Sequence, residues 1–244
     1  MKCSSENLEP LVQSLMHGQY GSKHISVHAE SCVGQYELCM GPDRDVPALL
    51  TNLTCVVKRM QDTAAAFNGM LDFSAKPHLD RPGSAFHIHV NLQDKNGTNL
   101  FFTDRPGKTM SETLTHSIGG LCAHIKRHML FFAPNVQSYL RYTHHDIHTP
   151  TTVSWGGNNR STTLRIPDTT LEPEKCRIEH RVAGADCNYV DATAAVLFGI
   201  ARGLEQKLLP PAKTFGIASD TQYGLERLPL SLSEAIALHV PMEL

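Results

Sequence analysis

The chain has 244 residues, 41% of them apolar and 19% charged, which is ordinary for a globular core and argues against a disordered chain. Its formal net charge of −2 and its lack of Lys/Arg blocks argue against a nucleic-acid partner, and no run reaches the roughly 18 apolar residues that a membrane helix needs. Seven cysteines without a CxxC pair, and a start without the apolar core of a signal peptide, predict free thiols and a cytoplasmic location.

Helical and strand periodicities alternate in the first third of the chain. Apolar spacing predicts a short helix over 7–16, and alternation predicts strands over 23–30 and 35–40 around a turn at Gly34. Such a hairpin brings Glu30 and Glu37 together, which is a solvated surface unless other ligands join them. A broad apolar stripe predicts a long helix over 46–67, and a further strand is expected over 70–78.

Two later stretches alternate apolar with polar or charged residues, as strands with one polar face do. The polar side carries His87, His89 and Asn91 in 83–92 and Arg177, Glu179 and Arg181 in 176–182, and the stretch 159–167 adds Arg160 and Arg165. Taken alone, each could be no more than a solvated outer face. If the strands share a sheet, histidines, a glutamate and four arginines converge on one surface, which suits a divalent metal and phosphate.

The remaining segments favour helices and loops. A capping-box pattern at 109–112 predicts a helix through Met129 that the Ala133-Pro134 step ends, and a buried helix is expected over 191–209, stopped by Pro210-Pro211. Ser231 is expected to cap a last short helix. The close histidines His144, His145 and His148 fit either a flexible polar loop or a metal site. Interspersed strands and helices predict the α+β class, with a mixed or antiparallel sheet flanked by helices.

Four motifs in this order, HAESCVGQYE, GSAFHIH, NNRSTTLRIP and RIEHRVAGADCN, closely resemble the catalytic half of the glutamine synthetase family, which includes glutamate–polyamine ligases. The resemblance runs from about Ile25 to the end of the chain. It implies one catalytic domain over residues 1–244 and ATP-dependent amide formation with Mg²⁺ or Mn²⁺. In that reaction the γ-carboxylate of glutamate attacks the terminal phosphate of ATP, and ammonia or an amine then displaces phosphate from the acyl phosphate.

The resemblance also implies roles for particular residues. Glu30 and Glu37 correspond to ligands of one metal ion, and His87 and Glu179 to ligands of a second. The implied ATP-binding residues are His89, Asn91, Arg160 and Arg165; the implied glutamate-binding residues are Gly83, Arg141, Arg160 and Arg181, of which Arg160 and Arg181 would also be catalytic. Oxygen ligands with one imidazole suit Mg²⁺ or Mn²⁺. The four metal ligands are expected to face one concave surface.

Departures from the family pattern qualify the activity. Family members normally begin with a smaller β-rich domain and a strand bearing two more metal ligands, and they form ring homo-oligomers in which that domain completes a neighbour's site. This sequence starts after both, so a truncated or partial form is expected, with weaker metal binding and little activity in isolation. His148 stands near the place of a flap glutamate, which favours an amine substrate or a changed activity. Three functions remain: a ligase, a catalytically silent relative with a binding or assembly role, and a metallohydrolase that uses the HxH pair.

Overall fold

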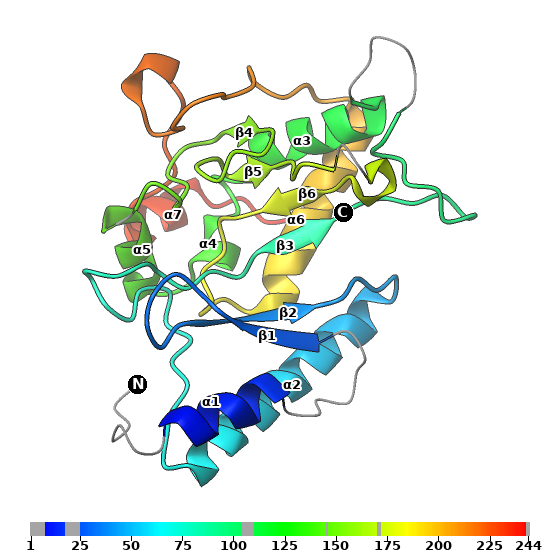
Figure 1. Cartoon of the computed structure of the whole chain (residues 1–244). Coiled ribbons are helices and arrows are strands. Elements are labelled where there is room, and N and C mark those ends of the chain that lie inside the picture. The colour runs from blue at the N-terminus through cyan, green and yellow to red at the C-terminus, as the bar shows by residue number, and fades with distance from the viewer. Residues whose placement is uncertain (1–7, 18–24, 104–109, 145, 170–171, 243–244) are drawn as a thin grey trace. The chain divides into compact units, whose positions relative to one another are not determined.

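Residues 8–17, 25–103, 110–144, 146–169 and 172–242 are described by a computed structural model of the chain (Figure 1). They fall into two units, one ending at Phe73 and the other beginning at Ser74, and each unit has its own apolar core. The expected single domain over residues 1–244 stays a prediction.

The first unit contains two helices and a hairpin: α1 (Leu8–His17), β1 (Ile25–Ala29), β2 (Tyr36–Met40) and α2 (Val46–Ala66). These elements confirm the predicted ones. α2 begins where the side chain of Asp45 accepts a hydrogen bond from the amide of Ala48, and its first turn contains Pro47, as helix starts favour. Its buried stripe packs with apolar residues of α1 and β1, and the shared core consists of Leu11, Leu15, Val27, Val56, Met60 and Ala64.

The strand predicted over 70–78 is wrong, because this segment forms no ladder with the described strands. Pro77 has no backbone N–H to contribute to a ladder, and the carbonyl of Ala75 instead accepts a hydrogen bond from the amide of Ser84 at 2.9 Å. The segment is therefore an irregular connection, and the boundary between the units lies in it.

A four-stranded sheet organises the second unit, with the order β3 (Ile88–Val90), β6 (Ile178–His180), β5 (Leu164–Arg165), β4 (Trp155–Gly156). β6 pairs antiparallel with both neighbours, whereas β4 and β5 are parallel. The sheet is therefore mixed and confirms the predicted α+β class. Strands from the stretches 83–92, 159–167 and 176–182 do share this sheet, although each strand is shorter than its stretch.

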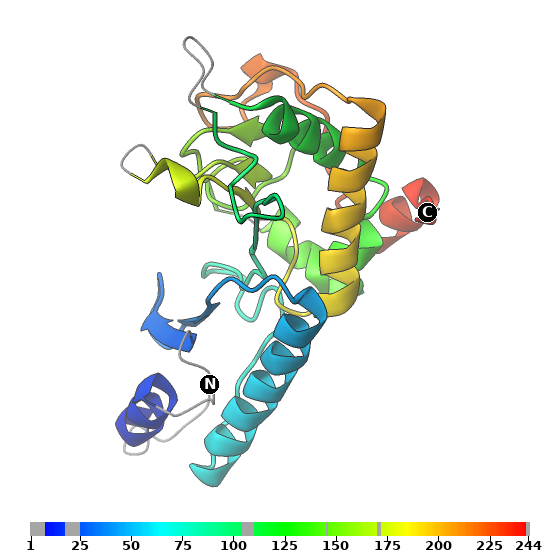
Figure 2. The same ribbon diagram turned by 90° about the vertical axis from the view of Figure 1, so that its right-hand side faces the viewer.

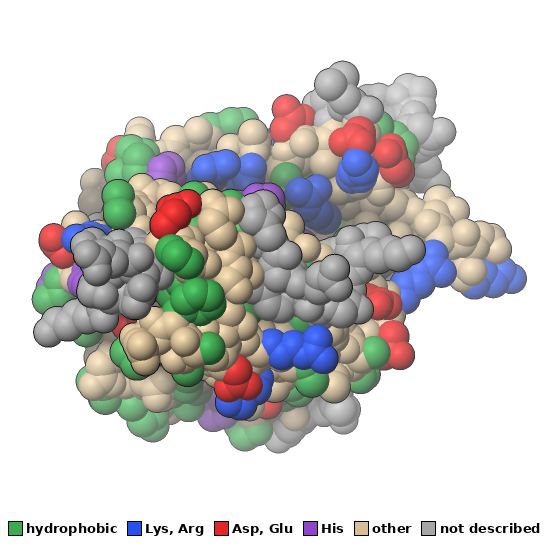
Figure 3. Space-filling model, turned by 60° about the horizontal axis from the view of Figure 1, so that its bottom comes forward, with side chains coloured by type: hydrophobic (Ala, Val, Ile, Leu, Met, Phe, Trp, Pro, Cys, Tyr) green, Lys and Arg blue, Asp and Glu red, His purple; other side chains and the backbone are tan. Residues whose placement is uncertain are grey.

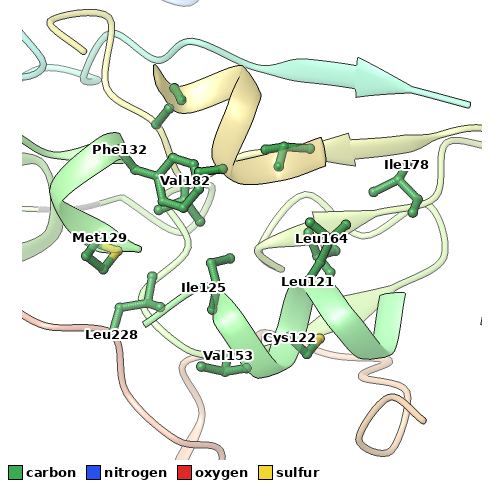
Figure 4. Packing of buried hydrophobic residues seen from close by; sticks show 14 of the residues in the cluster. Leu121, Cys122, Ile125, Met129, Phe132, Val153, Leu164, Ile178, Val182 and Leu228 are labelled. Atoms are coloured by element: carbon green, nitrogen blue, oxygen red, sulfur yellow. The ribbon is translucent and has the colours of Figure 1, made fainter. Parts of the chain in front are cut away.

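Helices cover one side of this sheet (Figure 2). The two long ones are α3 (Glu112–His124) and α6 (Tyr189–Gln206), and the short ones are α4 (Met129–Phe132), α5 (Leu140–Thr143) and α7 (Leu232–Leu238). Single 3₁₀ turns span Val136–Tyr139, Pro173–Lys175 and Thr221–Tyr223. The core between helices and sheet includes Leu121, Ile125, Phe132, Leu164, Ile178 and Val182 (Figure 4).

Glycines set the separation of α3 and α6. A Cβ built on Gly120 would lie 2.1 Å from the carbonyl oxygen of Gly199, and one on Gly203 would lie 2.2 Å from that of His116. Because backbone rather than a flexible side chain occupies this space, the helices can approach so closely only without side chains at these positions.

Three predicted helix boundaries in the second unit need correction. α3 is capped by Ser111, whose hydroxyl accepts from the amide of Leu114, while Thr109 lies outside the described residues. This helix also stops at His124 and resumes as α4 after a turn, so it does not run unbroken through Met129. α6 ends at Gln206, before Pro210 is reached, because Lys207 takes the left-handed conformation with φ 52°.

Membrane-spanning helices, cysteines and surface charge were compared over the described residues. Their helices include none that combines the length and apolar character needed to cross a bilayer. The six described cysteines are free, as predicted. On the face drawn in Figure 3, acidic and basic side chains are interspersed among apolar ones.

Candidate active site

The register of the four-stranded sheet places a histidine, a glutamate and an arginine in one row. Glu179 on β6 pairs with His89 on β3 and with Arg165 on β5. Residues in register on neighbouring strands point to the same side of a sheet. The opposite side of β6 faces the core, where His180 is fully buried against the ring of Phe132. The polar row therefore lies on the side of the sheet that faces away from the core.

Glu179 is the centre of an ion-pair cluster. Its Oε2 accepts from Nη1 of Arg165 at 2.7 Å, and its Oε1 accepts from Nη1 of Arg181 at 2.6 Å. The glutamate and Arg181 side chains are only 4% and 7% exposed. Burial raises the pKa of Glu179, but the positive charge of Arg181 and the other neighbouring groups outweigh it, and the net pKa is below its usual value. The carboxylate is therefore held in its charged form.

His87 lies beside the same carboxylate, with its Nδ1 3.3 Å from Oε1 of Glu179. Burial, followed by the charge of Arg181, lowers the pKa of His87 to about 3, although Glu179 opposes the shift. The contact is consequently one between a neutral imidazole and a carboxylate at neutral pH. The structure thus brings together the two residues expected to bind the second metal ion.

These two residues fit part of a site for Mg²⁺ or Mn²⁺. A carboxylate and a neutral imidazole are suitable donors, and Mg²⁺ commonly completes its shell with waters and substrate phosphate oxygens. Within the described ranges, no group of three or more His, Cys, Asp and Glu side chains is placed to hold a metal ion. Any cation at His87 and Glu179 would therefore need ligands beyond this pair.

Glu30 and Glu37, expected to bind the other metal ion, lie in the hairpin of the first unit. His28 pairs with Glu37, and the amide of Glu30 donates to the carbonyl of Gln35, so both glutamates point to one side of the hairpin as predicted. Both are exposed. Burial, then the charges of Glu37 and Glu30, raise the pKa of the neighbouring Cys39 to about 11, which reflects the negative field on this face. That all four expected ligands face one surface stays a prediction.

Arg141, one of the expected glutamate-binding residues, is anchored to the segment that directly follows β6. Arg141 on α5 is 3% exposed, and it donates to the carbonyls of Val182 at 2.6 Å and Arg181 at 3.1 Å. A Cβ on Gly83 would lie 3.0 Å from Cγ of Arg141, so these two expected glutamate-binding residues are adjacent. Arg181 in turn donates to the carbonyl of His148 at 3.2 Å, which ties the histidine-rich loop to the cluster.

Arg160 belongs to the loop 157–163 between β4 and β5, and no hydrogen bond or ion pair among the described residues joins its side chain to this cluster. Its side chain is exposed and has no ion-pair partner in the described part of the chain. The loop itself is held firmly: the side chain of Asn159 donates to the carbonyl of Gly216 at 2.8 Å, and the hydroxyl of Ser161 accepts from the amide of Ala218 at 2.9 Å. Asn158 in the same loop accepts from Arg165 at 3.0 Å and thereby helps to orient that guanidinium.

Two contacts went unpredicted. Arg177, immediately before β6, donates from Nε to Nδ1 of His89 at 3.0 Å, and Asn158 orients Arg165. Alternation predicts that Arg177 is on the same side as Glu179, but the sequence carries no signal for its contact with His89. Asn91 follows β3 and is half-buried.

The sequence of this chain matches that of a known catalytic domain. The family model "Glutamine synthetase, catalytic domain" matches residues 4–239, and the chain belongs to this family. Relatives include gamma-glutamylputrescine synthetase PuuA of Escherichia coli, 33% identical over 74% of this chain and 37% of the relative. Gamma-glutamylethanolamide synthetase GlnA4 of Streptomyces coelicolor is 30% identical over 95% of this chain and 48% of the relative.

Two further comparisons are with a glutamine synthetase sequence and with a solved structure. Type-1 glutamine synthetase 2 of Dictyostelium discoideum is 34% identical over 96% of this chain and 45% of its own length. The solved structure of GmaS with ADP superposes with a TM-score of 0.76 at 24% identity, covering 96% of this chain and 54% of that one, and shows the shared fold. The chain thus spans less than half the length of each of these three sequence relatives.

Proposed function

We propose that this chain carries the catalytic chemistry of an ATP-dependent ligase that joins the γ-carboxylate of glutamate to ammonia or an amine. The observation that carries the proposal is the cluster in which Glu179 contacts Arg165, Arg181 and His87 within a chain of this family. Positive charge beside a divalent-metal ligand is what phosphoryl transfer requires. A metallohydrolase built on the HxH pair would leave the arginines without a task.

The proposed reaction has two steps. A γ-carboxylate oxygen of glutamate attacks the terminal phosphorus of ATP, and ADP leaves with the electrons of the broken P–O bond. The nitrogen lone pair of ammonia or the amine then attacks the acyl carbon, phosphate departs, and the nitrogen loses a proton. A divalent cation held by His87 and Glu179 supplies charge neutralisation at the phosphate oxygens when bound.

The protein's own groups would position the reactants. Arg160 and Arg165 would bind phosphate and Arg181 the glutamate carboxylate, because a guanidinium matches both anions with paired donors. Arg141 and Gly83 would shape the glutamate side of the site, and His89 and Asn91 the nucleotide side. The chain would thus contribute binding and charge stabilisation to transfer.

The nitrogen donor of the second step differs among the relatives. Relatives at 30% identity or above act, by name, on putrescine, ethanolamine and isopropylamine, besides the glutamine synthetases. His148, which stands near the expected place of a flap glutamate, is tethered through its carbonyl to Arg181. We therefore propose a small alkyl amine as the nitrogen donor.

Nucleotide binding tests the proposal first. Calorimetry with a non-hydrolysable ATP analogue and Mg²⁺ should detect binding to the 244-residue chain, and Arg165→Ala should weaken it at least tenfold, because one charge-assisted contact is lost. Arg202→Ala is the matched control, since Arg202 pairs with Glu205 on α6, outside the cluster. Equal affinity in the wild type and Arg165→Ala would refute the assignment of this site.

Turnover then separates ligase from silent relative. Phosphate release is measured with ATP, glutamate and either ammonia, putrescine, ethanolamine or isopropylamine. We expect residual nucleotide binding with little glutamate-dependent phosphate release, because His87 and Glu179 have no third protein ligand for a cation among the described residues. A loosely held cation loosens the geometry of phosphoryl transfer, which lowers the rate before it lowers the affinity. Robust amine-dependent release that Arg160→Ala abolishes would show instead that the chain is a complete ligase. The oligomeric state and the cytoplasmic location stay predictions.

A further inference from the structure

Arg177 makes a hydrogen bond to His89 in which only one assignment of donor and acceptor is possible. Its Nε lies 3.0 Å from Nδ1 of His89, and its Nη1 lies 3.2 Å from the carbonyl oxygen of Lys175. A guanidinium has donors and no acceptor, and it stays charged in proteins. Arg177 is therefore the donor, and Nδ1 of His89 must offer its lone pair.

The proton of a neutral imidazole is fixed by this contact. When Nδ1 of a neutral imidazole accepts a hydrogen bond, the proton of the ring is on Nε2. Hydrogen bonds to one ring nitrogen commonly determine the tautomer of a histidine. No hydrogen bond to Nε2 occurs among the residues that the structure describes, and His89 is exposed. His89 consequently presents an N–H donor to whatever lies on the polar side of the sheet.

We infer that Arg177 is a positioning residue, which holds His89 in the Nε2–H tautomer so that His89 donates a hydrogen bond to a phosphate oxygen of the nucleotide. The identity of the ligand rests on the proposed function, whereas the tautomer rests on the contact alone. The opposite tautomer would direct a lone pair at a phosphate oxygen, which also carries only lone pairs. Charge on Arg177 alone would not achieve this selection, because a cation placed elsewhere has no preference between the ring nitrogens.

Nitrogen NMR of the free protein tests the tautomer without any ligand. In ¹⁵N-histidine-labelled wild-type protein at pH 8, His89 should show a protonated-type Nε2 and an unprotonated-type Nδ1. Arg177→Ala should bring the two nitrogen shifts measurably closer, because both tautomers then become populated, and Arg177→Lys, which restores a donor, should recover part of the difference. Arg202→Ala is the control. A proton on Nδ1 in the wild type, or identical shifts in the wild type and Arg177→Ala, would overturn the inference.

A double-mutant cycle tests whether Arg177 acts through His89. Binding of the non-hydrolysable ATP analogue is measured for the wild type, Arg177→Ala, His89→Ala and the double variant. His89→Ala should weaken binding about tenfold, as loss of one hydrogen bond to a charged group does. Arg177→Ala should weaken it only about twofold, because the Nε2–H tautomer stays partly populated, and the double variant should be no weaker than His89→Ala. Effects that multiply would show that Arg177 contacts the ligand independently and would overturn the positioning role. If the wild type fails to bind the analogue, the proposed function and the phosphate part of this inference fall, while the NMR result still decides the tautomer.

Discussion

Glu179 shows how a single buried carboxylate can fix the charges around it. Its side chain is 4% exposed and shares its oxygens between Arg165 and Arg181. Removing its charge leaves two guanidinium groups close together without a counter-charge, and a buried pair broken on one side is far more costly than a surface pair.

Glu179→Gln should therefore lower the free energy of unfolding by about 3 kcal/mol, the range found when one partner of a buried ion pair is lost. Urea unfolding followed by circular dichroism measures the change. Glu174→Gln, at an exposed position a few residues away, is the control and should leave the midpoint in place. A Glu179→Gln midpoint equal to that of the control would mean that the cluster contributes nothing to stability.

His128 is a second residue whose burial has a measurable effect. It is 2% exposed and stacks with His124 at 5.4 Å between ring centroids. Burial first, then the charges of His124, His239 and Arg127, lower the pKa of His128 to about 4. An unfolded histidine has a pKa of about 6.5, so between these values the unfolded chain binds the proton and the folded chain does not.

The stability from His128 is therefore complete above pH 6.5 and is lost as the pH falls toward 4. His128→Phe keeps the aromatic packing without the titrating group, and its free energy of unfolding should fall less between pH 7 and pH 5 than that of the wild type. Chemical unfolding at both pH values measures this, with the exposed His78→Phe as control. Parallel losses in the wild type and His128→Phe would contradict the assignment.

At the scale of elements, the crossing of α3 and α6 depends on the absence of side chains. Gly203→Ala should destabilise the chain by about 1–3 kcal/mol, because its Cβ meets the backbone of His116, an overpacking cost that exceeds the roughly 1 kcal/mol gain in helix propensity. Gly199→Ala on the same helix meets Leu121 Cδ2 at 3.1 Å, the end of a flexible side chain, so its cost should be much smaller. Thermal unfolding of the two variants compares them directly, and equal melting temperatures would show that the crossing relaxes freely.

Alternation along the chain predicted the side that His89 and Glu179 take, and this part holds, while Arg165 was expected beside them only if the strands shared a sheet. The same pattern overestimated the length of the strands. A strand ends where its partner strand turns away, and because the partner is distant in sequence, the local pattern does not show where this happens. The row that joins these residues could not be predicted, because register across β3, β6 and β5 depends on strand order. The interruption after His124 likewise has no local Gly or Pro signal.

At the scale of the whole molecule, the separate cores of the two units lead to a further expectation. The core of the second unit is formed by residues from Phe101 onward, with none from before Ser74. A fragment over 74–244 should therefore keep native secondary structure and a cooperative thermal transition by circular dichroism. The counterpart fragment over 1–73 is the comparison. A fragment over 74–244 that melts without cooperativity would show that the second unit needs the first.

The anchored loop between β4 and β5 has a thermodynamic consequence for whatever binds there. Asn159 and Ser161, on either side of Arg160, are both fastened to the distant segment 214–218. The backbone entropy of this loop, about 1–2 kcal/mol for each residue, is therefore lost on folding rather than on ligand capture. A ligand that engages Arg160 has only that side chain's rotamers to order, at no more than about 2 kcal/mol.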